Sequence, residues 1–89
     1  MNVYVLNGKM FSDKNASYSY LKKMLPLPVY FSKNLDSLYD CLVDYLQNTT
    51  IILINQQYLL ESLGEYGQDF ISVFDDAAKN IESFIFIKQ

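Results

Sequence analysis

The chain has 89 residues, of which 51% are hydrophobic, seven are lysine and ten are acidic, giving a formal net charge of −3. This length fits one domain over residues 1–89, with enough apolar residues for a core without metal or disulfide staples. Because there is no histidine and only one cysteine, Ser-His and Cys-His nucleophilic sites and thiolate metal clusters are excluded. The three glycines form no phosphate-binding loop. We therefore expect no catalytic residues, no metal ligands and no cofactor.

Three continuous apolar runs predict β-strands at Val3–Leu6, Ile51–Ile54 and Phe84–Ile87. Runs without polar alternation are typical of parallel strands that are covered on both faces. The segments between the runs have helical spacing, so strands and helices alternate. We expect an α/β fold, a small single domain with a three-stranded parallel sheet packed by about four helices in two or three layers with right-handed crossovers.

The first predicted helix follows the first strand. Asn15 is a suitable N-cap, and Pro26 stops the helix at about Leu25. Its inner face consists of Tyr18, Leu21 and Leu25. A proline-bounded loop, residues 26–33, then leads into the second helix.

The second predicted helix, residues 34–46, is acidic on one side. Asp36, Asp40 and Asp44 are spaced four residues apart and stack on one face. The inward face consists of Leu38, Leu42 and Tyr45, with Leu35 and Leu46 at its edge. Each like-charge pair costs the helix roughly 0.2–0.5 kcal/mol. The two interpretations are a solvated acidic face and a surface that meets a positively charged partner.

Two more helices are predicted after the second strand. The short one covers residues 58–63 and ends at Gly64. The longer one covers residues 68–81, and its apolar stripe consists of Phe70, Phe74, Ala77, Ala78 and Ile81.

The charges are segregated along the chain. Eight carboxylates and no basic residue lie between Lys33 and Lys79, whereas the first third has five lysines and only Asp13 as an acid. A nucleic acid partner requires Lys or Arg opposite its phosphates, so the acidic part predicts a basic protein surface or a cation. Asp36 and Asp40 could hold a hard cation, but two aspartates are too few ligands and no calcium-loop spacing is present.

No targeting or membrane segment is recognisable. No apolar h-region with a cleavage site is recognisable at the start, so we expect no cleavable leader, and no apolar run approaches the roughly 18 residues of a membrane span. The lone Cys41 cannot form an intramolecular disulfide, and it is expected as a packed small hydrophobe, with a reactive thiol as the alternative. We expect a soluble cytoplasmic protein.

The segment Leu27–Leu42, with the sequence LPVYFSKNLDSLYDCL, resembles the hallmark segment of the barstar family, which are intracellular inhibitors of barnase-type ribonucleases. Asn7-Gly8, Leu21-Lys22-Lys23, Val73-Phe74 and an apolar last strand extend the resemblance across the chain. It implies a barstar-like fold and a partner that is a basic extracellular-type ribonuclease or a toxin nuclease. The two would bind one-to-one, with no direct contact to nucleic acid or membrane.

The resemblance also implies which residues make contact. In the family, the loop and the second helix enter the ribonuclease cleft, where helix carboxylates occupy the place of substrate phosphates. Asp40 would be the central phosphate mimic. The alternative is a cytoplasmic acidic interaction module that docks a basic partner other than a nuclease. The expected partner-binding residues are Tyr30, Asn34, Leu35, Asp36, Tyr39, Asp40, Val43, Asp44 and Asp76.

Several positions depart from the family pattern. Ser32 stands where the loop usually has Gly, and Tyr39 replaces the usual Trp. Val43-Asp44 replaces Thr-Gly at the helix end, and Asn80 stands at a position that is acidic in the best-known member. We therefore expect a cognate enzyme that differs from barnase, such as a toxin nuclease with this chain as its immunity partner.

Overall fold

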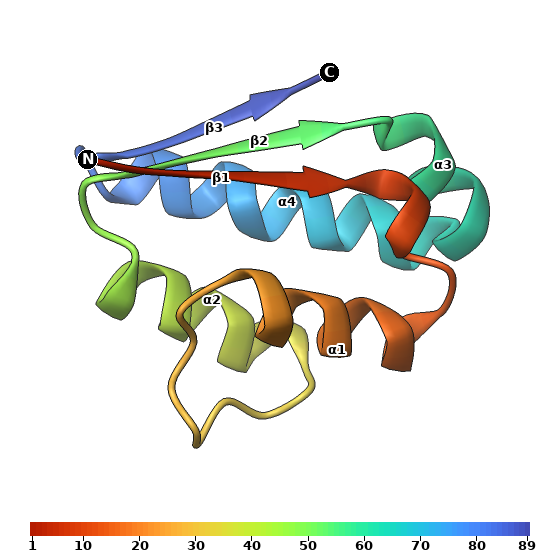
Figure 1. Cartoon of the computed structure of the whole chain (residues 1–89), viewed down its shortest axis with the longest axis horizontal. Helices are drawn as coiled ribbons and strands as arrows, with labels where there is room; N and C mark the ends of the chain where they lie inside the picture. Colours follow the sequence, from red (N-terminus) through yellow and green to blue (C-terminus); the bar gives the residue numbers. More distant parts are fainter.

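Three parallel strands form one sheet in the computed structural model, which describes residues 1–89. The strands are β1 (Asn2–Asn7), β2 (Thr49–Ile54) and β3 (Phe84–Lys88), and β2 lies between the other two. Both neighbouring pairs are parallel (Figure 1). The predicted three-stranded parallel sheet is confirmed, and each strand is slightly longer than its apolar run.

Four α-helices and one short 3-10 turn connect the strands, as the fold prediction required. No helix has the length and apolar character needed to cross a membrane. α3 (Gln56–Leu63) and α4 (Glu65–Asn80) begin two and three residues earlier than predicted. α2 (Leu35–Tyr45) is one residue shorter at each end than the predicted residues 34–46, because Asn34 and Leu46 are its caps. The helical segments are η1 (Gly8–Met10), α1 (Lys14–Met24), α2 (Leu35–Tyr45), α3 (Gln56–Leu63) and α4 (Glu65–Asn80).

The predicted N-cap of α1 is wrong. The cap is Asp13, whose extended backbone precedes the helix and whose carboxylate accepts a hydrogen bond from the Ala16 N–H at 2.8 Å. Asn15 lies inside the first turn, and its side-chain oxygen accepts from Lys33 Nζ at 3.0 Å instead. At the other end Leu25 is the C-cap, directly before Pro26, as predicted.

The helices all lie on one side of the sheet, so the domain has two layers (Figure 1). The prediction that both sheet faces are covered is therefore wrong. On the uncovered face Val3 is 58% exposed, Val5 and Ile85 are each 45% exposed, and Ile87 is 40% exposed. The reason is topological: the strand order runs in one direction, so two right-handed crossovers place every helix on the same face.

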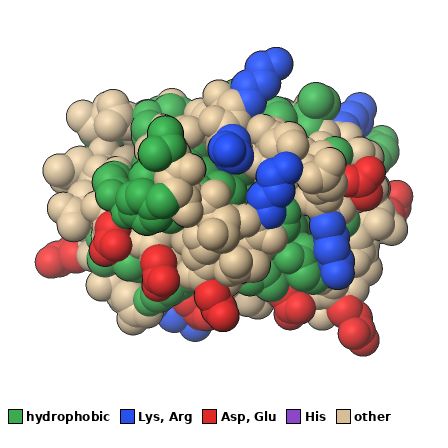
Figure 2. Space-filling view, turned by 90° about the horizontal axis from the view of Figure 1, so that it is seen from below, with side chains coloured by type: hydrophobic (Ala, Val, Ile, Leu, Met, Phe, Trp, Pro, Cys, Tyr) green, Lys and Arg blue, Asp and Glu red, His purple; other side chains and the backbone are tan.

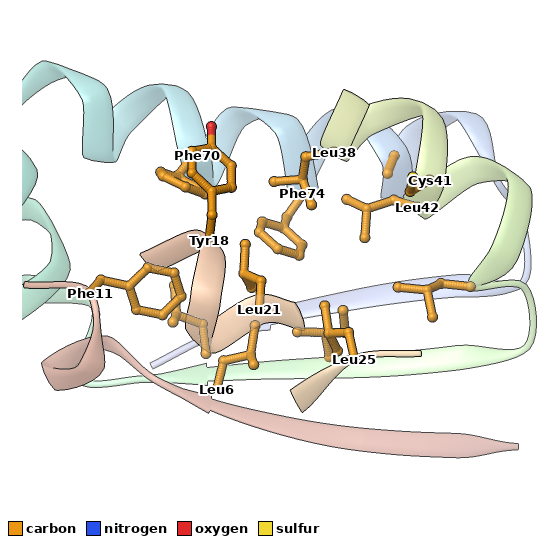
Figure 3. Packing of buried hydrophobic residues seen from close by; sticks show 14 of the residues in the cluster. Leu6, Phe11, Tyr18, Leu21, Leu25, Leu38, Cys41, Leu42, Phe70 and Phe74 are labelled. Carbon is orange, nitrogen blue, oxygen red and sulfur yellow. The ribbon is translucent and has the colours of Figure 1, made fainter. Parts of the chain in front are cut away.

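The hydrophobic core lies between the sheet and the helices (Figure 3). Each strand alternates, so one row of side chains from every strand points toward the helices. Tyr18 is 2% exposed, and its hydroxyl is hydrogen-bonded to the hydroxyl of Tyr66. Burial raises the pKa of Tyr18 above its ordinary value. The central residues are Leu6, Phe11, Tyr18, Leu21, Leu38, Leu42, Ile51, Leu53, Phe70, Phe74 and Phe84.

The ends of β1 and β2 meet closely at Gly8. A Cβ atom at this position would lie 2.1 Å from the backbone oxygen of Asn55, so only glycine fits. The side-chain amide of Asn55 also donates to the Asn7 side-chain oxygen at 3.1 Å. The Asn7-Gly8 pair thus fixes the turn that leads from the sheet toward α1. A second glycine, Gly64 with φ +58°, separates α3 from α4 as predicted.

Candidate protein-binding site

α2 presents its carboxylates to solvent and its leucines to the core. Asn34 caps the helix, because its side-chain oxygen accepts from the Ser37 N–H at 2.7 Å. Leu38 and Leu42 are completely buried, as predicted. At 100° per residue, Asp40 lies nearly opposite the centre of this buried face, and Asp36 and Asp44 extend the same exposed row. We call Asp36, Asp40 and Asp44 the acid row.

The acid row has no cationic partner within the chain. Lys88 with Asp75, at 3.0 Å, is the one salt bridge in the structure, and it lies on β3 and α4. The last turn of α2 contains no basic residue that would offset the helix dipole. The row therefore remains available to positive groups from outside the molecule.

One flank of the acid row is joined to α4. Asn80 Nδ2 donates a hydrogen bond to the hydroxyl of Tyr39, which is half-buried. These are two of the positions that depart from the family pattern, and they form a single contact. The exposed Asp76 precedes Asn80 by one helical turn, so it lies on the side of α4 that faces α2. Val43, also half-buried, follows Tyr39 by one turn along the same flank.

The other flank is the loop between α1 and α2. Phe31 anchors this loop: it is 6% exposed, and its ring lies 6.0 Å from that of Tyr18. The Phe31 N–H donates to the Pro28 carbonyl at 3.0 Å and closes a turn. Val29 and Tyr30, at the tip of the turn, are 99% and 63% exposed. The buried ring of Phe31 thus anchors the loop to the core, while the tip of the loop is accessible to a partner.

Two contacts attach the loop to α2. The Ser32 N–H donates to Ser37 Oγ at 2.9 Å, and the hydroxyls of Tyr30 and Tyr45 are hydrogen-bonded to each other. This hydrogen bond raises the pKa of Tyr30 from its ordinary value of 10.0 to about 12. Ser32 has no positive φ, so a residue with a Cβ is accepted where the family usually has glycine.

The inward assignment of Tyr45 is wrong. Its side chain is 48% exposed, and Leu46, at 1% exposure, occupies the core position at the end of α2. The phenol needs a hydrogen-bonding partner, and Tyr30 supplies one at the surface.

Nine site residues were predicted, and eight of them lie on α2, at its N-cap or in the loop before it. Of these, Tyr30, Asn34 and the acid row are exposed, and Leu35, Tyr39 and Val43 are half-buried. The ninth, Asp76, is exposed on α4. Sequence reasoning missed Ser37 and Tyr45, which hold the loop. A signal for Ser37 was present, since it stands three residues after the helix cap, where a hydroxyl can bond to the preceding loop.

The segregation of charge along the sequence persists in part in space (Figure 2). Viewed from the helix side, most of the visible carboxylates lie along the left and lower edges of the molecule, and most of the visible lysines lie above them, whereas further carboxylates lie at the right beside lysines. Lys9 and Lys14 lie over the rings of Tyr58 and Tyr66, at 4.9 and 4.2 Å from the centroids, rather than beside carboxylates.

Cys41 is part of the core below the acid row. It is 2% exposed, and burial raises the pKa of its thiol, which disfavours the reactive thiolate. Its interpretation as a packed hydrophobe is confirmed. No three side chains of the metal-binding types gather into a possible metal site.

The fold and this surface define a small acidic α/β domain whose loop and second helix are joined by two hydrogen bonds and expose the acid row. Residues 1–86 match the family described as Barstar (barnase inhibitor), so the chain belongs to the barstar family of ribonuclease inhibitors, which are not enzymes. The chain is also 29% identical over 83 residues to a Bacillus subtilis (strain 168) protein named "Putative ribonuclease inhibitor YrdF". That similarity covers 92% of this chain and 91% of the relative.

Proposed function

We propose that this chain inhibits a barnase-type ribonuclease, or a related toxin nuclease, by placing the loop and α2 in the cleft of the enzyme. The acid row would occupy the place of substrate phosphates, with Asp40 at its centre, and one inhibitor would bind one enzyme. The observation that carries this proposal is the exposed acid row without a cationic partner, on a helix whose opposite face is buried.

The chemistry of a nuclease cleft complements such a row. A site that binds phosphates collects Lys, Arg and His, and carboxylates pair with these groups through short charge-assisted hydrogen bonds. Because Leu38 and Leu42 fix the rotation of α2, the acid row is held in position before binding.

The flanks of the row would complete the contact. Tyr30 offers an exposed aromatic side chain on a loop that Phe31 and Ser37 already hold, so little chain entropy is lost on binding. Tyr39 and Asp76 would extend the surface toward α4. The names given to the family and to the Bacillus subtilis relative support a ribonuclease as the partner.

The test compares Asp40→Ala with Glu61→Gln. Both residues are exposed acids on helices, but Glu61 lies on α3, outside the proposed contact. We expect Asp40→Ala to weaken inhibition by at least about 2 kcal/mol, or roughly 30-fold, which is the range of interface hot spots. Glu61→Gln should inhibit like the wild type. RNA cleavage by a barnase-type enzyme is titrated with each variant, and denaturant unfolding verifies that each is folded.

Full inhibition by a folded Asp40→Ala variant would remove Asp40 from the centre of the contact. Failure of the wild type to inhibit barnase-type and toxin nucleases would instead favour the other class, an acidic module that docks a basic partner other than a nuclease. Calorimetric titration with the enzyme gives the stoichiometry, which we expect to be one-to-one.

A further inference from the structure

The side of the sheet away from the helices is an uncovered apolar surface (Figure 1). The strand register aligns Val3, Thr50 and Ile85 in one row and Val5, Ile52 and Ile87 in the next. We call this surface, with Ile54 at its end, the open sheet face. Its residues on the two edge strands, Val3, Val5, Ile85 and Ile87, are 40–58% exposed.

The open sheet face has no charged side chain. Lys88 is the only charged residue in the three strands, and it points to the helix side, where it pairs with Asp75. Edge and surface strands usually carry lysines or other charges that discourage association. Parallel sheets are also almost always covered on both faces. A face of this composition is therefore suited to contact with another protein surface.

We propose that the open sheet face packs against the same face of a second copy of this chain, giving a two-fold symmetric dimer. The strands contribute no charged side chain to this face, so an identical face can pack against it without burying a side-chain charge, whereas most protein surfaces present charged residues. β-Branched side chains on two such faces interdigitate at the spacing of about 10 Å that stacked sheets adopt.

The area of the open sheet face limits the affinity of the dimer. Three strands spaced about 4.8 Å apart, with a rise of about 3.3 Å per residue, span roughly 15 by 20 Å. Two such faces pressed together cover roughly 600 Å² in total, which is below the about 1,000 Å² that a stable specific interface needs. We therefore expect a weak, reversible dimer. Met1 lies at the margin of the open sheet face, where its sulfur accepts a hydrogen bond from Thr50 Oγ1 at 3.7 Å. Its side chain is 85% exposed and flexible, so it can adapt its conformation to the second copy.

This contact is independent of the proposed inhibition. α2 and the loop lie on the side of the molecule away from the open sheet face (Figure 1). A dimer would carry two acid rows that point away from each other, and each could still bind an enzyme.

Sedimentation velocity from about 1 µM to about 1 mM protein tests the dimer. The wild type should shift from monomer to dimer within this range. Val5→Lys places a charge opposite its own copy and should weaken the dimer at least tenfold. Val29→Lys, the same substitution at a loop residue that is 99% exposed, is the matched control and should leave the dimer unchanged. Salt should not weaken the contact, because the face is uncharged and screening reduces repulsion between two copies of charge −3.

A second variant keeps the test valid if Val5→Lys does not fold. Ile87→Thr keeps the β-branched shape while it removes apolar area, so it should weaken the dimer with little change in the denaturant midpoint. A wild type that stays monomeric at the highest concentration overturns the proposal. A dimer that survives both Val5→Lys and Ile87→Thr, or that Val29→Lys abolishes, also overturns it. Inhibition of ribonuclease by Val5→Lys should equal that of the wild type, so the two proposals can fail separately.

Discussion

Leu42→Ala tests the orientation of α2, on which the proposed site depends. Leu42 is completely buried between the helices and the sheet, so truncation leaves a cavity and should cost about 2–5 kcal/mol. A chain of 89 residues has an unfolding entropy that makes each kcal/mol worth about 5 °C. We therefore expect the midpoint of thermal unfolding to fall by about 10–25 °C.

The assay combines urea unfolding with inhibition of the ribonuclease at 25 °C. A domain of this size has a total stability of roughly 4–13 kcal/mol, so the folded fraction of Leu42→Ala depends on where the protein lies in this range, and inhibition should fall only with that folded fraction. Asp44→Ala is the control on the exposed side of the same helix, and its stability should be equal or higher by a few tenths of a kcal/mol. If Leu42→Ala keeps the wild-type midpoint but no longer inhibits, α2 is rotated and its two faces are reversed.

Two further predictions concern charge and the loop. Replacing Glu61 and Glu65 with Gln should slow association with the enzyme slightly and leave the dissociation rate almost unchanged, whereas Asp40→Ala should raise the dissociation rate strongly. Stopped-flow measurements give both rates. If the glutamate pair raises the dissociation rate more than Asp40→Ala does, the contact does not lie on α2. Steered association is the known behaviour of barnase and barstar, so this expectation is partly inherited from the family. Tyr30 should ionise near pH 12, and Tyr45→Phe should bring its pKa back toward 10 by removing the hydrogen bond that raises it. The raised pKa stabilises the folded state below about pH 10, and this stabilisation is lost as the pH rises through about 12. Ultraviolet titration of tyrosine ionisation in the wild type and in Tyr45→Phe measures this pKa difference. Equal pKa values for Tyr30 in the two proteins would show that the hydrogen bond does not form in solution.

The elements that could be predicted from the sequence are those whose signals are local. α2 has an N-cap at Asn34, leucines at one helical spacing and aspartates at another, and its bounds and rotation followed from these residues alone. The three strands were equally recognisable as short apolar runs. The segment that carries the family resemblance supplies both the buried leucines of α2 and its exposed aspartates, because side chains at helical spacing alternate between the two faces.

The features that could not be predicted depend on residues far apart in sequence. The open sheet face follows from the strand order, which the apolar runs do not reveal. The outward position of Tyr45 depends on Tyr30, fifteen residues earlier, and the contact between Tyr39 and Asn80 spans forty-one residues. The start of α1 was also misplaced, because Asp13 and Asn15 are both good caps and only the backbone at Asp13 decides between them.

The acid row lowers the stability of α2, although it favours the proposed binding to a basic partner. Two like-charge pairs cost the helix roughly 0.4–1 kcal/mol, and the last turn has no basic residue to offset the dipole. The Asn34 cap contributes about 1 kcal/mol, and the burial of Leu38 and Leu42 contributes several times more. The helix is thus held mainly by its buried face, which lets the exposed face be chosen for a partner. Asp40→Ala should therefore raise the stability of the free protein slightly while it weakens inhibition, as expected where a functional surface opposes the fold.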